Sequence, residues 1–267
     1  MKKSQIALAI SLMVSGSAFA GTFVNGGFED GNLGSWTGGG GCWNGGSFFD
    51  FSCGAPNIPL AGNPAPLNPA SFVGGTPHNT IVGVGIDPIT GASTVYGGNF
   101  AVRANDSIND YAVSTIKQSV TNYTANNIFF AWNAVLEASH GLTDSDHFAL
   151  TLHDDTDNID IVSRSYSSAG SIGSGTGSVT WSTFGEWFSS GWVVEEIDLL
   201  ALGVVGHDFT LSLLAADCPY GGHAGYVYLD GFGAAPPVQG GGVPEPATLA
   251  LLGLGLLGMG AARRKSA

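Results

Sequence analysis

Glycine is the residue that most limits how this chain can fold, because 42 of its 267 residues are Gly. Each Gly in a helix interior costs about 1 kcal/mol relative to Ala, so this density excludes a helical bundle. Aromatic side chains are also abundant, with 15 Phe, 7 Tyr and 6 Trp. Leaving so many apolar rings in water is unfavourable, which excludes a chain that is disordered throughout. The sequence therefore predicts a folded, mostly β protein with Gly-rich turns.

Short runs of β-branched and aromatic residues recur between turns of Gly, Asn and Asp, as is typical of strands. In one run Phe148, Leu150 and Leu152 alternate with other residues, which predicts one buried face. Only the short stretch 195–202 has a helical pattern. The pattern predicts an all-β fold of two packed antiparallel sheets, a jelly-roll-like β-sandwich. We expect strands at 80–86, 99–104, 112–120, 128–137, 147–153, 159–166, 192–199, 208–215 and 226–232.

The chain is strongly acidic, with a net charge of −13 from 8 basic and 21 acidic residues. It therefore lacks the basic surface that displaces counterions from phosphates, so we exclude a nucleic-acid binder. Between residues 21 and 242 the net charge is −17, because 3 basic residues stand against 20 acidic ones. Such a surface attracts Ca²⁺ and repels anionic polymers.

The N-terminus has the three parts of a secretory signal peptide. Lys2 and Lys3 precede the apolar run 6–14, and small residues follow, ending Ala18-Phe19-Ala20. The apolar run is too short to span about 30 Å of hydrocarbon, which argues against a membrane anchor. We predict a signal helix within residues 1–20 and export of the chain that begins at Gly21.

The C-terminus contains three parts in order, namely Val243-Pro244-Glu245-Pro246, the apolar stretch 247–262, and the cations Arg263, Arg264 and Lys265. A helix over the apolar stretch is about 24 Å long and can span a membrane if the cations snorkel. Those cations are expected to stay cytoplasmic. This arrangement resembles the PEP-CTERM sorting signal of Gram-negative bacteria. A plain C-terminal anchor explains the helix and cations but leaves Pro-Glu-Pro unexplained.

The resemblance implies a partner and a location. The partner is exosortase, a membrane transpeptidase that recognises the motif and removes the tail. The resemblance also implies transient anchoring in the inner membrane, then a place at the cell surface or in the extracellular matrix. Members of this family accompany exopolysaccharide and biofilm production. We divide the chain into a signal peptide (1–20), a β-sandwich ectodomain (21–235), a Gly/Pro linker (236–242) and the sorting signal (243–267).

Two further stretches resemble the first and last strands of galactose-binding-like jelly rolls, a fold of many carbohydrate-binding modules. They are 25–31, which reads Asn-Gly-Gly-Phe-Glu-Asp-Gly before Trp36, and 226–230, which reads Tyr-Val-Tyr-Leu-Asp. The resemblance implies a structural Ca²⁺ held by Glu29 and Asp230, which would clip the two strands together. Gly231 departs from the family, which often has a second acid there. Two solvated acids without an ion are therefore the alternative.

The three cysteines are Cys42, Cys53 and Cys218. Export permits disulfides, and the short loop between Cys42 and Cys53 closes at a lower entropy cost. We predict this pairing, and a bond from Cys218 to either of the others is the alternative. Cys218 and His223 flank a Gly-Gly turn, but without a third orienting group they do not indicate catalysis.

Other polar clusters are weaker candidates for sites. A hairpin is expected around 154–160, and its four Asp residues are typical of a solvated turn, with Ca²⁺ binding as the alternative. A second cluster has a spacing that fits no familiar zinc site, and we interpret it as a polar loop: His140, Asp144, Asp146 and His147.

Two functions remain. The first is a non-enzymatic surface or matrix protein that binds carbohydrate such as exopolysaccharide. The second is a secreted glycoside hydrolase, or another hydrolase, with an unrecognised pair of carboxylates. A deep cleft with two acids about 5–10 Å apart would favour the hydrolase, and a shallow surface would favour binding.

Overall fold

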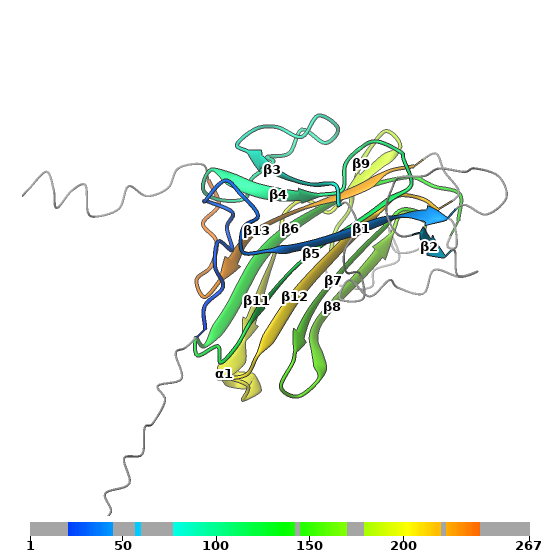
Figure 1. The fold of residues 1–267 in the computed structure, drawn as a ribbon. Coiled ribbons are helices and arrows are strands. Elements are labelled where there is room, and N and C mark those ends of the chain that lie inside the picture. Colours follow the sequence, from blue (N-terminus) through cyan, green and yellow to red (C-terminus); the bar gives the residue numbers. More distant parts are fainter. Residues whose placement is uncertain are drawn as a thin grey trace, which may run out of the picture.

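A computed structural model describes residues 21–44, 57–59, 77–141, 145–169, 179–219 and 223–240. They form two packed β-sheets (Figure 1). The first sheet has six strands in the order β2-β1-β5-β12-β7-β8. β1 and β2 are parallel, and the other neighbours in this sheet are antiparallel. The bounds are β1 Thr37–Asn44, β2 Asn57–Pro59, β5 Ala112–Val120, β7 His147–Asp154, β8 Ile159–Ser167 and β12 Phe209–Ala216.

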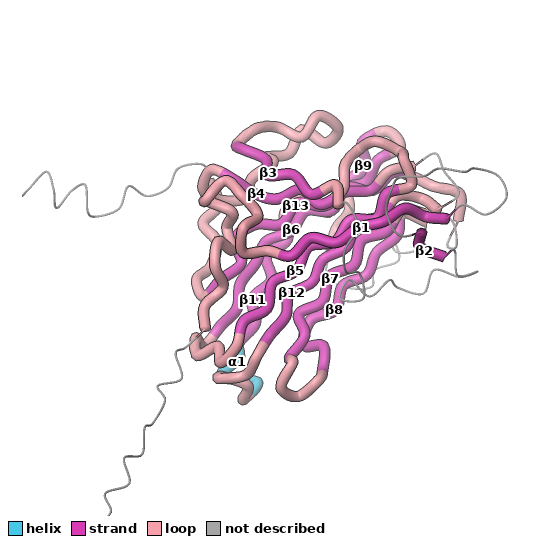
Figure 2. Tube along the Cα trace, viewed as in Figure 1, coloured by secondary structure: helices cyan, strands magenta, loops and turns pink. Residues whose placement is uncertain are grey.

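The second sheet is antiparallel and has the order β3-β4-β13-β6-β10-β9, with β11 also paired to β6. Figure 2 shows strands joined by loops, with one short helix, α1 (Leu199–Leu202), among the described residues. The side chain of Asp198 caps this helix, because its carboxylate accepts from Ala201 N. The bounds are β3 Asn79–Gly83, β4 Phe100–Ala104, β6 Asn127–Glu137, β9 Ser182–Phe184, β10 Trp187–Ser189, β11 Val193–Asp198 and β13 Gly225–Gly233.

The core lies between the sheets and follows the expected alternation. On β7, Phe148, Leu150 and Leu152 are each 0% exposed. Trp132 of β6 faces them, and its ring centroid lies 4.8 Å from that of Phe148. The predicted two-sheet sandwich is confirmed, and each of the nine predicted strands overlaps an observed one.

The start of the sandwich departs from the sequence prediction. Residues 25–31 form turns, so the expectation that this stretch is the first strand is wrong. Asn25 and Phe28 have positive φ values of 52° and 60°, which a strand does not tolerate. The side chain of Asn25 holds the turn, since Oδ1 accepts from Asp30 N at 3.0 Å and Nδ2 donates to Asn32 O at 2.8 Å.

Three connections cross between the sheets at the same end of the sandwich: 105–111, 138–146 and 217–224. Asp217, which is 0% exposed, fastens two of them. Its Oδ1 accepts from Asn105 Nδ2 at 2.8 Å, and its Oδ2 accepts from Ala112 N at 2.9 Å. The opposite end contains α1 and the β7–β8 turn (Figure 1).

The expected signal helix within 1–20 and the C-terminal transmembrane helix lie outside the described residues. Among the residues that the structure describes, no helix is long and apolar enough to cross a membrane.

Candidate functional site

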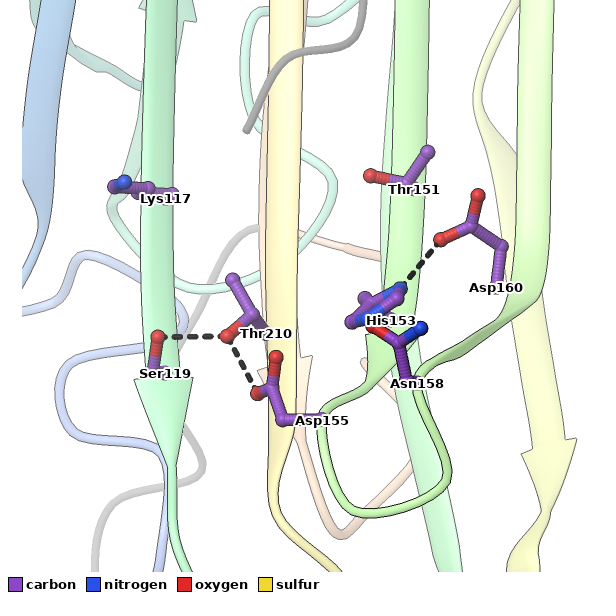
Figure 3. A pocket seen from close by; sticks show the side chains of 8 residues that line it. All are labelled: Lys117, Ser119, Thr151, His153, Asp155, Asn158, Asp160 and Thr210. Atoms are coloured by element: carbon purple, nitrogen blue, oxygen red, sulfur yellow. Dashed lines mark hydrogen bonds and ion pairs between the residues drawn. The ribbon is translucent and has the colours of Figure 1, made fainter. Parts of the chain in front are cut away.

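A polar groove of about 470 Å³ lies on the outer face of the first sheet, across β5, β12 and β7. Strand register forms it, because Thr210 of β12 lies opposite Ser119 on one side and His153 on the other. These side chains point outward because they alternate with the buried core positions. Figure 3 shows the lining residues, which are Lys117, Ser119, Thr151, His153, Asp155, Asn158, Asp160 and Thr210.

Hydrogen bonds link the lining residues into two groups (Figure 3). In the first, the Thr210 hydroxyl lies 2.7 Å from Ser119 Oγ and donates to Asp155 Oδ2 at 2.7 Å. In the second, His153 Nδ1 lies 2.7 Å from Asp160 Oδ1. That hydrogen bond raises the pKa of His153 and favours an imidazolium that donates to the carboxylate. The groove thus offers hydroxyl donors, two carboxylates and two basic side chains on one face.

Glu29 and Asp230, the two residues expected to hold an ion, lie around one segment of backbone. Asp230 Oδ2 accepts from Tyr96 N at 2.9 Å and from Gly97 N at 3.0 Å. Glu29 Oε1 accepts from Asn99 N at 2.9 Å. The structure therefore brings the beginning and end of the sandwich together through residues 96–99.

The space around these two carboxylates is tight. Gly98 has φ +66°, which strains other residues, and a Cβ there would displace the carboxylate of Glu29. Gly27 lies between the acids, since a Cβ on it would be 3.7 Å from Asp230 Oδ1 and 3.8 Å from Glu29 Cγ. Burial, with a further contribution from the charge of Glu29, raises the pKa of Asp230 to about 7.

A second buried acid, Asp87, holds a loop over the outer face of the second sheet. Its Oδ2 accepts from the hydroxyls of Tyr226 at 2.7 Å and Tyr228 at 2.8 Å. Its Oδ1 accepts from Thr90 N at 2.7 Å and from Ile89 N at 3.1 Å. Burial opposes ionisation of Asp87, but these hydrogen bonds outweigh it and lower its pKa.

Among the other sequence candidates, Asp154 and Asp157 lie beside His207, and His140 lies near Cys218 and His223. In the cluster interpreted as a polar loop, Asp146 is 0% exposed and accepts from Glu137 N at 2.8 Å. Burial lowers the pKa of His147 to about 4, so this side chain is neutral at pH 7. Asp144, Cys53 and the side chain of Cys42 lie outside the described residues, and with them the predicted disulfide. The sorting residues Val243, Pro244, Glu245, Pro246, Arg263 and Arg264 also lie outside them.

Sequence reasoning missed the groove itself. Its residues come from strands that are distant in the chain, and only the pairing register places them in one row. The available signal was the run of polar residues at every second position, such as Lys117 and Ser119 on β5, and Thr151 and His153 on β7.

Comparison with solved structures finds β-sandwich carbohydrate-binding modules. The module TmCBM61, solved with β-1,4-galactotriose, is 12% identical with a TM-score of 0.40, and the match covers 80% of this chain and 97% of that one. A structure of carbohydrate-binding modules from the β-sandwich superfamily is 11% identical with a TM-score of 0.33, covering 80% and 62%. The enzymatically active domain of tailspike protein 4 from bacteriophage CBA120 is 7% identical with a TM-score of 0.36, covering 79% and 20%.

Among curated proteins, none matches this chain. The C-terminus gives a family match that agrees with the order of Pro-Glu-Pro, apolar stretch and terminal cations. Residues 242–265 match the model of the family described as the PEP-CTERM protein-sorting motif, so the chain ends in a PEP-CTERM sorting signal.

Proposed function

We propose that this protein is exported, processed by exosortase and retained at the cell surface or in the matrix, where it binds a neutral polysaccharide without cleaving it. The observation that carries the proposal is the row of polar side chains across the first sheet. Ser119, Thr210 and His153 lie opposite one another on neighbouring strands, and Asp160 lies opposite His153 on the fourth. Such a row can follow an extended sugar chain that crosses the strands.

The chemistry of the groove favours sugars. Each sugar hydroxyl both donates and accepts, and carboxylates such as Asp155 and Asp160 accept from them through charge-assisted hydrogen bonds. The groove volume of about 470 Å³ falls within the range of ligand sites, about 300–1,000 Å³. The net charge of −13 disfavours the binding of anionic polymers, so we propose that the ligand is an uncharged polysaccharide.

Substitutions in the groove should weaken binding to neutral oligosaccharides. Asp155→Asn and Thr210→Val each remove a hydrogen-bonding group while keeping the size of the side chain. A hydrogen bond to a charged group contributes about 1.5–3 kcal/mol, so we expect at least about tenfold weaker binding from Asp155→Asn. The measurement is calorimetry with the full-length protein and the best neutral oligosaccharide from a glycan array.

Glu196→Gln is the matched control, because Glu196 is an exposed acid on β11 of the other sheet. The Glu196→Gln protein should bind the oligosaccharide with the affinity of the wild type. Binding that persists in Asp155→Asn, or that is confined to anionic glycans, contradicts the proposal. Release of shorter sugars would instead favour the hydrolase, with Asp155 and Asp160 as its carboxylates.

We also propose a structural Ca²⁺ at Glu29 and Asp230. Support comes from the placement of two carboxylates around residues 96–99 and on either side of Gly27. Carboxylate and carbonyl oxygens are the ligands that Ca²⁺ prefers. An ion there would offset the repulsion between the two acids and link the beginning of the sandwich to β13.

Millimolar Ca²⁺ is expected to raise the melting temperature of the full-length protein, and EDTA should lower it. An ion that binds only the folded state stabilises by about 2.7 kcal/mol at one hundred times its Kd. Glu29→Gln and Asp230→Asn should abolish most of the rise, whereas Asp30→Asn, in the same turn, should keep it. An unchanged wild-type melting curve rejects the site. If Glu29→Gln and Asp230→Asn both respond to Ca²⁺ as the wild type does, the ion binds elsewhere, and the acids of the β7–β8 turn are the next candidates.

A further inference from the structure

Three side chains that can coordinate a transition metal lie together where β6 ends and β13 begins. His140 follows β6, and Cys218 and His223 lie in the connection between β12 and β13. One atom from each, an imidazole nitrogen or Sγ, lies within 4.8 Å of the other two. Two imidazoles and a thiolate form a ligand set that Zn²⁺ favours. We propose that His140, Cys218 and His223 bind a zinc ion.

Backbone pairing brings the three positions together. Gly225 of β13 lies opposite Leu136 of β6, and Glu137 N donates to Ala224 O at 3.1 Å just beyond that pair. The two chains therefore run side by side as they approach His140 and His223. Cys218 N donates to His223 O at 2.9 Å, which closes the loop between those two residues. The ligand positions are thus set by the sheet and exist without the ion.

The side chains are arranged to receive a cation. The rings of His140 and His223 meet edge to face with centroids 4.5 Å apart. Nδ1 of His223 is buried and has no hydrogen-bond partner among the described residues, which is unfavourable unless another group satisfies it. Cys218 is 0% exposed, so its sulfur faces the protein interior. A metal ion would supply the missing partner of His223.

The fit to zinc follows from bond lengths. Zn–N bonds of about 2.0–2.1 Å and Zn–S bonds of about 2.3 Å place tetrahedral ligand atoms roughly 3.3–3.8 Å apart. A spread of up to 4.8 Å needs to close by at most about 1.5 Å, which side-chain rotation can provide. Three protein ligands leave one position for water or another molecule. Ca²⁺ is disfavoured here because it prefers oxygen ligands.

Another cluster of three metal-ligating groups in the described chain, Asp154, Asp157 and His207, serves as a comparison. There Nδ1 of the histidine already has a partner. His207 Nδ1 lies 2.8 Å from Asp154 Oδ2, and Asp154 Oδ1 accepts from Thr156 N at 3.0 Å. These contacts fasten the β7–β8 turn to the loop before β12. We therefore place the zinc at His223, whose buried Nδ1 has no hydrogen-bond partner among the described residues.

The test uses reduced, metal-free, full-length protein titrated with Zn²⁺ by calorimetry and with Co²⁺ by absorption spectroscopy. We expect one ion per chain, proton release on binding, and a sulfur-to-cobalt charge-transfer band. His140→Gln and His223→Gln should each weaken binding on the order of 100-fold, and Cys218→Ser should also remove the band. His207→Gln is the matched control and should bind like the wild type.

His140 is exposed, so His140→Gln tests the site without disturbing the core. Unchanged Zn²⁺ affinity in that variant overturns the proposal, as does the absence of stoichiometric binding by the wild type. Loss of binding in His207→Gln would assign the ion to the other cluster. A disulfide at Cys218 in the exported protein, detected by peptide mapping, would also overturn it, because a thiolate is required.

Discussion

Asp87→Ala is expected to lower the free energy of unfolding by about 4 kcal/mol, because it removes the acceptor shared by two buried tyrosine hydroxyls and two backbone amides. Each donor left buried without a partner costs about 1–3 kcal/mol, and relaxation recovers part of the sum. The melting temperature of a chain this size should fall by roughly 10 °C. Urea and thermal unfolding of the full-length protein measure both quantities.

Tyr226→Phe and Tyr228→Phe provide a double-mutant cycle for this network. Removing the two hydroxyls together with the carboxylate should cost less than the separate losses combined, since no tyrosine hydroxyl is then left without its acceptor. Asp30→Ala, at an exposed acid, should change stability by less than about 0.5 kcal/mol. A loss below about 1 kcal/mol in Asp87→Ala would contradict the role assigned to the network.

Acid should weaken the same network. Burial alone would raise the pKa of Asp87. The hydrogen bonds that its carboxylate accepts have the larger, opposite effect, so its pKa is lower in the folded protein than in the unfolded chain. The contribution of Asp87 to stability is then complete above an unfolded pKa of about 3.9 and is lost as the pH falls through the folded value. The stability difference between wild type and Asp87→Asn should therefore shrink below about pH 4.

Glu245→Ala is expected to abolish processing of the C-terminal tail and leave the chain uncleaved in the membrane fraction. Glu245 is the only acid between residues 243 and 267, so it is the single negative group in that segment that a sorting enzyme can recognise. Pro244 and Pro246 restrict the backbone on either side and favour an extended presentation of its side chain. Mass spectrometry of surface and membrane fractions measures the outcome.

Thr248→Ala is the matched control, because Thr248 lies three residues away in the apolar stretch and carries no charge. Its product should have the same mass and location as the processed wild type. Normal release of the Glu245→Ala protein would show that this sorting signal does not depend on the acid.

Most of the fold could be predicted because strand-forming residues mark most of the strands. β1 could not, since its sequence Thr-Gly-Gly-Gly-Gly-Cys-Trp-Asn lacks β-branched residues beyond the first. Its extended form comes from pairing with β5, where Gly38 lies opposite Ile116 and Gly41 opposite Val113. β9 and β10, three residues each, are also set by pairing rather than by composition.

The candidate sites were less accessible to sequence reasoning because each combines distant segments. Glu29 and Asp230 were matched by resemblance, and the structure adds the backbone segment that they share. His140 was grouped with its neighbours in the chain, and Cys218 with His223 alone. Only the pairing of β6 with β13 joins these groups. Side chains that act together across strands become visible once the register is known.

The fastening at Asp217 has a mechanical consequence for a tethered protein. If the groove holds a polysaccharide as proposed, that ligand would pull on β12, and an anchor attached beyond residue 240 would pull on β13. The shortest covalent route between these strands is 217–224, which Asp217 ties to Asn105 and Ala112. Tension therefore acts along strands that are clamped at one end. We expect the sandwich to unravel first from the α1 end under force.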